Sequence, residues 1–234
     1  MPEIRRAFTE ELDTIEAMLA QMGALVVDSV NRVTEVLLEV DLDGAQQVID
    51  ADDELDLLTV DLEERVYRVM ALQNPVASDL RLLVAAVKLG GEIERSGDLV
   101  TNIAKGVTRI ARIELDHEIR GLIARMGERA GALMHLAVSA LSERDAERAG
   151  SLAAEDDVLD QLHAEFVQQV FRSHDAGTLD VQQAVQLCLV GRFYERIGDH
   201  AVNVGERIHF VVTGWLPEHD GAERARRRHE RHAS

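Results

Sequence analysis

The chain has 234 residues, a formal net charge of −18 and a composition that is 46% hydrophobic but only 3% aromatic. That length suits two units of roughly 100 residues each, and the acidic balance argues against a nucleic-acid interface and against direct binding to an anionic membrane surface. The longest purely apolar run, 82–87, is far too short to cross a bilayer, and the first residues form no apolar signal segment, so we expect a cytoplasmic protein. Cys188 is the single cysteine and cannot form an internal disulfide.

Helical periodicity extends over nearly the whole sequence and is interrupted at a few turn signals. The breaks fall, in chain order, at 41–44, 74–75, 114–118, 144–145, 174–177 and 213–214. Three long helices on each side of the polar segment 114–118, joined by short loops, predict an all-α fold with antiparallel neighbours. We therefore expect two tandem three-helix bundles, related by internal duplication and joined end to end or side by side. The expected boundaries are a first bundle at 1–113, a linker at 114–118, a second bundle at 119–216 and a disordered, basic tail at 217–234.

An acidic motif occurs twice in the chain, with the copies 101 residues apart. The first copy is Glu94-Arg95-Ser96-Gly97-Asp98, followed by Asn102; the second is Glu195-Arg196-Ile197-Gly198-Asp199, followed by Asn203. Each copy places two carboxylates and an amide at i, i+4 and i+8, which gives three oxygen ligands on one face of a helix. The repeat indicates a duplicated unit, and the neighbouring like charges require compensation.

The middle helix of each unit carries a second acid pair with the same spacing, Asp52/Asp56 and Asp156/Asp160. In an antiparallel hairpin, residues equidistant from the turn lie at the same height. The midpoints of the two pairs in the first unit are 54 and 96, and halfway between them is Pro75, in the turn itself. In the second unit the midpoints 158 and 197 give 177.5, beside Gly177. The two acid pairs of each unit are therefore predicted to face each other.

Four carboxylates that converge in a partly dry groove cannot all stay ionised without a partner. Oxygen ligands from Asp, Glu and Asn suit hard cations, so the sequence predicts in each unit a site for Fe, Mg, Mn, Ca or Zn, with enough oxygens for a multinuclear cluster. The alternative is that Arg95 and Arg196 neutralise the acids through salt bridges. The predicted metal ligands are Asp52, Asp56, Glu94, Asp98, Asp156, Asp160, Glu195 and Asp199, with Asn102 and Asn203 as additional ligands.

The two E-R-x-G-D motifs, followed by Asn-Ile-Ala-Lys at 102–105 and Asn-Val-Gly-Glu at 203–206, resemble the signature of the PhoU family of phosphate-signalling regulators. The segment 74–81 is similar to that family's Q-P-x-A-x-D-L-R turn, and the whole resemblance spans about residues 7 to 214. It implies two three-helix bundles whose acid pairs carry metal ions. It also implies a non-enzymatic homodimer that represses the phosphate-starvation response and restrains phosphate uptake.

The partners that this resemblance implies are the ATPase of a phosphate ABC transporter and a PAS-containing sensor histidine kinase, which would hold the protein at the periphery of membrane complexes. The chain departs from the family pattern in two places. Asn74 replaces the usual Gln, and the second unit reads Asp180-Val181-Gln182 where the first has Asp79-Leu80-Arg81. A partner surface around Asp79 and Arg81 is therefore expected in the first unit alone.

A carboxylate-bridged di-iron enzyme is the main alternative, because helical bundles host such centres. That class uses Glu-x-x-His pairs that project inward, and the chain has two such strings, Glu114/His117 and Glu206/His209. The first falls in the expected linker and the second lies beyond the acid motif, so neither is predicted to meet the aspartates. A plain helical adaptor with a solvated acidic face is the other alternative. We expect a protein that is not an enzyme.

Overall fold

A computed structural model describes residues 2–110 and 115–215, with side chains from residue 6 onward. The expected tail at 217–234 lies outside the described residues. The described chain is entirely helical, which confirms the predicted fold class. Its helices are α1 (Pro2–Glu39), α2 (Leu42–Gln73), α3 (Ala77–Ile110), α4 (His117–Glu143), α5 (Ala146–Asp175) and α6 (Val181–Thr213).

Four helices begin with the same device, an aspartate at the N-cap. Its carboxylate accepts a hydrogen bond of 2.8–3.0 Å from the backbone N–H three residues later, which satisfies an otherwise unpaired donor. The capping residues are Asp41, Asp116, Asp145 and Asp180. Because Asp116 caps α4, that helix begins at His117, inside the segment 114–118 that was expected to be a linker. The break expected at 41–44 is also shorter than predicted, since α2 begins at Leu42.

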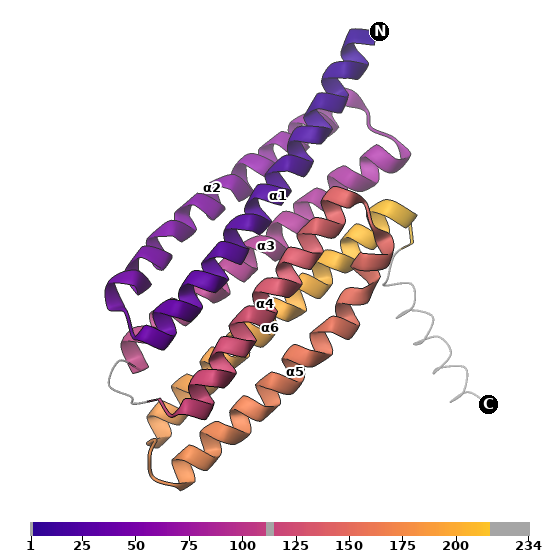
Figure 1. The fold of residues 1–234 in the computed structure, drawn as a ribbon. Helices are drawn as coiled ribbons and strands as arrows, with labels where there is room; N and C mark the ends of the chain where they lie inside the picture. Colours follow the sequence, from indigo (N-terminus) through magenta and orange to yellow (C-terminus); the bar gives the residue numbers. More distant parts are fainter. Residues whose placement is uncertain (1, 111–114, 216–234) are drawn as a thin grey trace, which may run out of the picture.

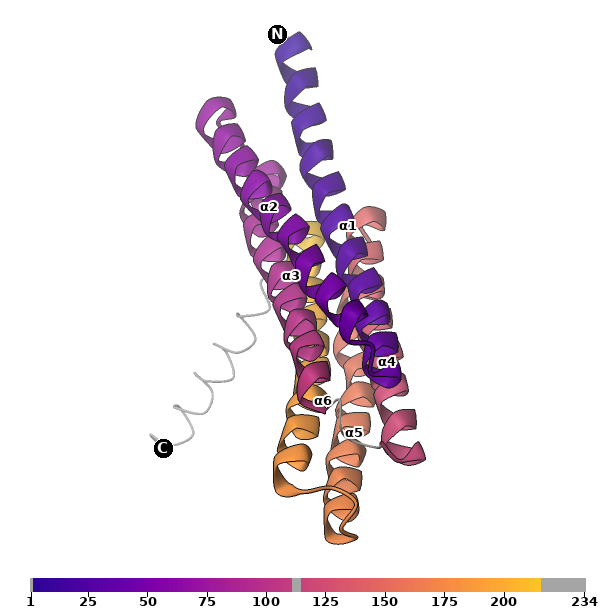
Figure 2. The same cartoon turned by 90° about the vertical axis from the view of Figure 1, so that its left-hand side faces the viewer.

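The two three-helix units pack side by side rather than end to end (Figure 1). Helices α1, α3, α6 and α4 form a ring in which each contacts the next, and this ring is the centre of the molecule. Helix α2 packs on α1 and α3 alone, and α5 on α4 and α6 alone, so each is the outer helix of its unit. Figure 2, turned by 90°, shows the long, narrow shape that results. One hydrophobic core runs through both units without a break.

A polar contact inside this core ties the two units together. Tyr194 of α6 is fully buried, and its hydroxyl lies 2.8 Å from the Thr34 hydroxyl of α1. Thr34 donates its own proton to the Val30 carbonyl at 2.7 Å, so the Tyr194 hydroxyl donates to Thr34. Burial raises the pKa of Tyr194, which stays a neutral donor.

No helix among the described residues combines the length and the apolar character needed to span a membrane.

Candidate metal site

Each unit brings its acid pairs together across the hairpin of its last two helices. We call Asp52, Asp56, Glu94 and Asp98 the first acid cluster, and Asp156, Asp160, Glu195 and Asp199 the second acid cluster. In the first, burial raises the pKa of Glu94, and the other three carboxylates of the cluster raise it further. In the second, burial raises the pKa of Asp156 to about 6, and Asp160 and Asp199 add to the effect. The acids of neighbouring helices therefore act on one another, as the hairpin geometry predicts.

Glycines in the acidic motif allow this close approach. A Cβ atom at Gly97 would lie 2.9 Å from Oδ1 of Asp52, and one at Gly198 would overlap Oδ1 of Asp156. Real Cβ atoms do not approach a carboxylate oxygen so closely. In both units the aspartate of the outer helix thus lies directly against the backbone of the helix that carries the motif.

The innermost aspartate of the first acid cluster has a hydrogen-bond donor. The Thr101 hydroxyl donates to Oδ2 of Asp52 at 2.9 Å. Burial raises the pKa of Asp52, as do the charges of Asp56 and Asp98, while the Thr101 hydrogen bond and Lys105 lower it. Asp52 is half-buried, so part of its charge is also solvated.

The matching aspartate of the second acid cluster has no such donor. Asp156 is only 8% exposed, and its buried Oδ1 has no hydrogen-bond partner. Val202 stands at the position that corresponds to Thr101. Oε2 of Glu195 is likewise buried and without a hydrogen-bond partner. Two unsatisfied carboxylate oxygens in one cluster are costly unless a cation or a proton compensates them.

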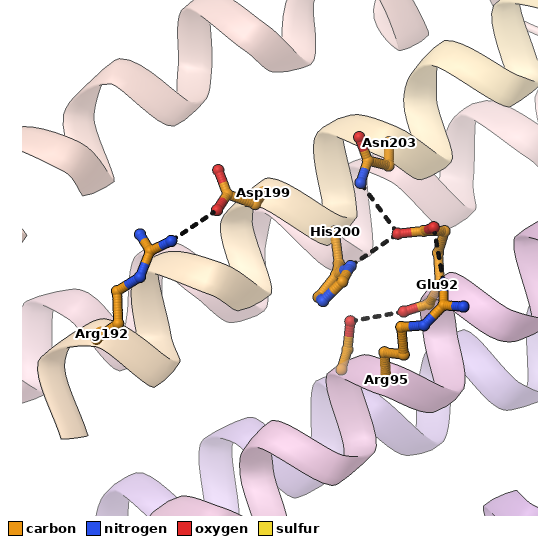
Figure 3. Close-up of polar contacts among 7 residues, drawn as sticks. Glu92, Arg95, Arg192, Asp199, His200 and Asn203 are labelled. Carbon is orange, nitrogen blue, oxygen red and sulfur yellow. Dashed lines mark hydrogen bonds and ion pairs between the residues drawn. The ribbon is translucent and has the colours of Figure 1, made fainter. Parts of the chain in front are cut away.

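A basic side chain contacts the outer part of the second acid cluster. Arg192 lies one turn before Glu195 on α6, and its guanidinium pairs with Oε1 of Glu195. It also contacts Asp199 (Figure 3), with Nη2 3.9 Å from Oδ2. The arginines of the motif itself do not take this role. Arg95 donates instead to Glu92 at 3.0 Å, and Glu92 lies outside the acid motif. This hydrogen bond does not support the alternative in which Arg95 neutralises the motif.

The donor set of the clusters fits a hard cation, although the side chains do not converge on one point. Hard cations take carboxylate oxygens, and the free oxygens of Asp156 and Glu195 are available for one. Within the described parts of the chain, no three Asp, Glu, His or Cys side chains are already arranged around a common metal position. A bound ion would therefore require some of these carboxylates to turn.

A polar cluster that the sequence did not predict lies next to the second acid cluster and joins the two units. Oε2 of Glu92, on α3, accepts hydrogen bonds from Nδ1 of His200 at 2.7 Å and from Nδ2 of Asn203 at 3.0 Å, both on α6 (Figure 3). Burial acts to raise the pKa of Glu92, but these two hydrogen bonds and the charges of His200 and Arg95 lower it overall. Phe193 stands at the position that corresponds to Glu92, so the second unit has no copy of this cluster.

The remaining predicted residues lie outside the clusters. The amide of Asn203, a predicted additional ligand, donates toward the other unit, and Asn102 is exposed. Asp79 is half-buried near the start of α3, and the half-buried Arg81 lies beside Gly214 at the end of α6. The two Glu-x-x-His strings are described only in part.

Glu114 lies outside the described residues, while His117 is the first residue of α4 and Glu206 and His209 line a separate surface hollow with Trp215. Among the described members of the two strings, none forms a ready metal-binding group with an acid cluster.

Comparisons with known proteins give a consistent result. A sequence model of the PhoU domain matches residues 19–107 and again 123–208. The "Phosphate-specific transport system accessory protein PhoU homolog 1" of Mycobacterium leprae is 36% identical over 219 residues, covering 93% of this chain and 97% of that protein. The "homolog 2" of Mycobacterium tuberculosis is 36% identical over 216 residues, covering 92% of this chain and all of that protein.

Solved structures also resemble this fold. The crystal structure of PhoU from Pseudomonas aeruginosa superposes with a TM-score of 0.83 at 27% identity, covering 89% of this chain and 100% of that one. The phosphate transport system regulatory protein PhoU from Streptococcus pneumoniae gives a TM-score of 0.81 at 23% identity, a likeness of fold.

Proposed function

The chain belongs to the PhoU domain family, and from that premise we propose that it is an accessory protein of a phosphate-specific transport system. One observation carries the proposal: relatives named as such accessory proteins are 36% identical to it along nearly their full length. These relatives are named as accessory proteins, which favours a role without catalysis.

We further propose that the protein represses the phosphate-starvation response and restrains phosphate uptake. In this role it would couple the ATPase of a phosphate ABC transporter to a PAS-containing sensor histidine kinase, as a homodimer at the cytoplasmic side of the membrane. The support is the likeness of its motifs at 94–98, 195–199 and 74–81 to the PhoU signature. Exposed apolar side chains on its outer helices, such as Tyr67 and Phe171, are compatible with protein partners.

Deletion of the gene in the source cell tests the regulatory role. We expect expression of alkaline phosphatase or of the phosphate transporter to rise under phosphate excess, and to return to its basal level when the wild-type gene is restored. Unchanged expression in the deletion strain under phosphate excess would contradict a repressor. Deletion separates the regulator from the alternative of a metal enzyme, which would leave this expression unaltered.

We also propose that the two acid clusters bind hard cations. In the second, Asp156 and Glu195 would hold the ion through their free buried oxygens, with Asp160 and Asp199 from the exposed side. Such an ion would offset the mutual repulsion of the four carboxylates. Oxygen ligands suit Fe, Mg, Mn, Ca and Zn alike, so elemental analysis is needed to identify the ion.

Elemental analysis and calorimetry test this proposal. The double substitution Asp98→Ala/Asp199→Ala removes one exposed ligand from each cluster, and we expect it to lower both the metal content and the affinity. The matched control is Asp53→Ala/Asp157→Ala, since both of these aspartates are exposed on the outer helices and belong to neither cluster. Equal metal content in the wild type and the Asp98→Ala/Asp199→Ala protein would remove the clusters as metal sites.

A further inference from the structure

The second acid cluster already contains a positive charge of the protein's own. Arg192 stands three residues before Glu195 and seven before Asp199, so all three lie on one face of α6. Its guanidinium pairs with Glu195. It also contacts Asp199 (Figure 3), at 3.9 Å. Planar guanidinium groups suit carboxylates, and this one links two members of the cluster.

Arg192 neutralises only the outer part of the cluster. Glu195 uses Oε1 for the arginine, while its Oε2 is buried without a hydrogen-bond partner. The inner Oδ1 of Asp156 is also buried and without a partner. The side chain of Arg192 is itself 48% exposed, so it has room to leave toward solvent. The inner oxygens thus form a donor set that the arginine does not reach.

The first acid cluster has no equivalent of this arginine. Gly91 stands at the position that corresponds to Arg192. Among the ion pairs of the described residues, none reaches the first acid cluster. The charges of Arg95 and Lys105 oppose part of the rise in the pKa of Glu94 and Asp52, respectively, but neither residue pairs with these acids. The two clusters share their acids, but only the second forms ion pairs with an arginine; Lys105 near the first and Arg129 near the second act on the inner aspartates without pairing with them.

We propose that Arg192 competes with metal ions for the second acid cluster, so that the first acid cluster, which has Gly91 instead, fills at lower cation concentrations. This inference rests on the proposed function of the clusters as cation sites. A divalent ion that takes Asp199 as a ligand must break the contact between Asp199 and Arg192, and the positive charge of the guanidinium also opposes the ion. The first acid cluster pays no such penalty. The chain would therefore respond to cation concentration in two steps, one for each unit.

The exposure of Arg192 sets how strongly it lowers the cation affinity of the second acid cluster. Partly exposed ion pairs are weak, and a monovalent charge a few ångströms from a divalent ion is strongly screened in water, so we expect Arg192 to lower the affinity about three- to tenfold. The reciprocal change is sterically possible. A Cβ atom at Gly91 would have Arg95 Nη1, at 4.0 Å, as its nearest neighbour, so an arginine fits there without displacing the backbone.

The test uses the full chain, stripped with a chelator and titrated with Mn²⁺ under electron paramagnetic resonance. Asp56→Asn/Asp98→Asn leaves the second acid cluster intact, and Asp160→Asn/Asp199→Asn leaves the first. Between these two backgrounds, we expect the first acid cluster to bind Mn²⁺ more tightly.

Reciprocal substitutions then assign the difference to the arginine. Arg192→Gln in the background that keeps the second acid cluster should raise its affinity about three- to tenfold, and Gly91→Arg in the other background should lower its affinity by a similar factor. Gly91→Gln adds comparable bulk without charge and should leave the affinity unchanged. Arg32→Gln, on α1 of the first unit, controls for the net charge in the Arg192→Gln experiment.

The outcomes separate this inference from the function on which it rests. If neither background binds Mn²⁺ at millimolar concentration, the clusters are not cation sites and the proposed metal function falls. If both bind, but the second acid cluster binds as tightly as the first, or Arg192→Gln or Gly91→Arg matches its control, the metal function stands and the competition by Arg192 is overturned. Circular dichroism on each variant confirms that the compared proteins are folded.

Discussion

The two halves of the molecule carry the same four acids at the same height of the same hairpin, yet they satisfy them by different means. In the first half, Thr101 donates to the innermost aspartate, Asp52. In the second half, a valine replaces that threonine and the matching Asp156 has a buried oxygen without a partner. The other carboxylates are compensated in the second half alone, where Arg192 pairs with Glu195 and contacts Asp199. Equal ligands in a duplicated fold therefore do not make equal sites.

This difference lies in residues next to the motif rather than in the motif. Gly91, Ala104 and Lys105 of the first half correspond in the repeat to Arg192, Gly205 and Glu206 of the second half. Each replacement changes either the local charge or the distance between two helices. A comparison limited to the E-R-x-G-D letters would rate the two sites as equivalent. Four substitutions distinguish the two halves, and their expected effects on stability decrease from Gly205→Ala to Tyr194→Phe.

The contact of Gly205 with the backbone of α5, in the second half, is expected to be the most sensitive. A Cβ atom at Gly205 would lie 2.8 Å from the Ala149 backbone oxygen of α5 and would overlap the Leu152 side chain. Gly205→Ala should therefore lower the free energy of unfolding by about 2–3 kcal/mol, since backbone atoms must move apart. Urea denaturation measures the change.

The first half provides the matched control for Gly205. It has Ala104 at the same position, so α2 already accommodates a methyl group there. Ala104→Gly should cost only about 1–2 kcal/mol, from helix propensity and the lost methyl group. A Gly205→Ala protein that is more stable than the wild type would show that α5 approaches α6 no more closely than α2 approaches α3.

The buried aspartates should differ in how much their charge destabilises the fold. Because burial raises the pKa of Asp156 to about 6, the folded state binds the proton more tightly than the unfolded chain does. Its ionised form therefore destabilises the protein fully above pH 6, and the penalty disappears as the pH falls toward the unfolded value near 4. With chelator present, Asp156→Asn should raise the free energy of unfolding by about 1–2 kcal/mol at pH 7.5.

Two controls accompany this substitution. The gain from Asp156→Asn should shrink between pH 6 and pH 4.5, where wild-type Asp156 becomes protonated. Asp52→Asn should give a smaller gain at pH 7.5, because Thr101 and Lys105 already offset part of the burial cost. The expectation that burial of charge costs more at Asp156 than at Asp52 would be contradicted by either of two results. One is a stability gain from Asp156→Asn that grows as the pH falls, and the other is a larger gain from Asp52→Asn.

The one-sided polar cluster between the halves should contribute measurable stability. Glu92→Gln removes the charge that accepts hydrogen bonds from His200 and Asn203 and should lower the free energy of unfolding by about 1–2 kcal/mol. Thermal unfolding at pH 7.5 measures the loss. Glu64→Gln, an exposed acid of α2, serves as control and should change stability by less than about 0.5 kcal/mol. Equal effects at the two positions would mean that the cluster does not hold the halves together.

The smallest effect is expected at the buried hydroxyl of Tyr194, where the first half has Ile93. Tyr194→Phe keeps the ring and removes the hydrogen bond to Thr34, which still donates to the Val30 carbonyl. The expected loss is about 1 kcal/mol, because no donor is left unpaired. Chemical denaturation checks it, and Thr34→Val in the same background should add little. A loss above about 3 kcal/mol would indicate that the hydroxyl has a partner besides Thr34.

Much of this architecture follows from the sequence because helices have a fixed period. The turns at Pro75 and Gly177 and the spacing of the acids are sufficient to predict that Asp52 meets Asp98 and that Asp156 meets Asp199. The sequence does not decide between a side-by-side and an end-to-end arrangement of the units, since periodicity shows which face of a helix is apolar but not which helix covers it.

For the same reason, the sequence does not predict the pairing of Glu92 with His200. These residues are 108 positions apart, and only the packing of α3 on α6 brings them together. Asn203 illustrates the limit most clearly. Its i+8 position predicts a ligand beside Asp199, yet its amide donates across the unit boundary. The start of α4 at His117 differs from the expected linker, because the cap at Asp116 lies inside a polar segment that resembles a linker.

The ring formed by α1, α3, α6 and α4 means that neither half has a closed surface without the other. Two polypeptides divided between α3 and α4 would each expose a long apolar face whose natural complement is the missing piece. We therefore expect the separated pieces to be poorly soluble alone and to reassociate when mixed, so that heat melts the intact chain in one transition. The shared core thus makes each duplicated unit part of the other's folding, and loss of either unit is expected to unfold the remaining one.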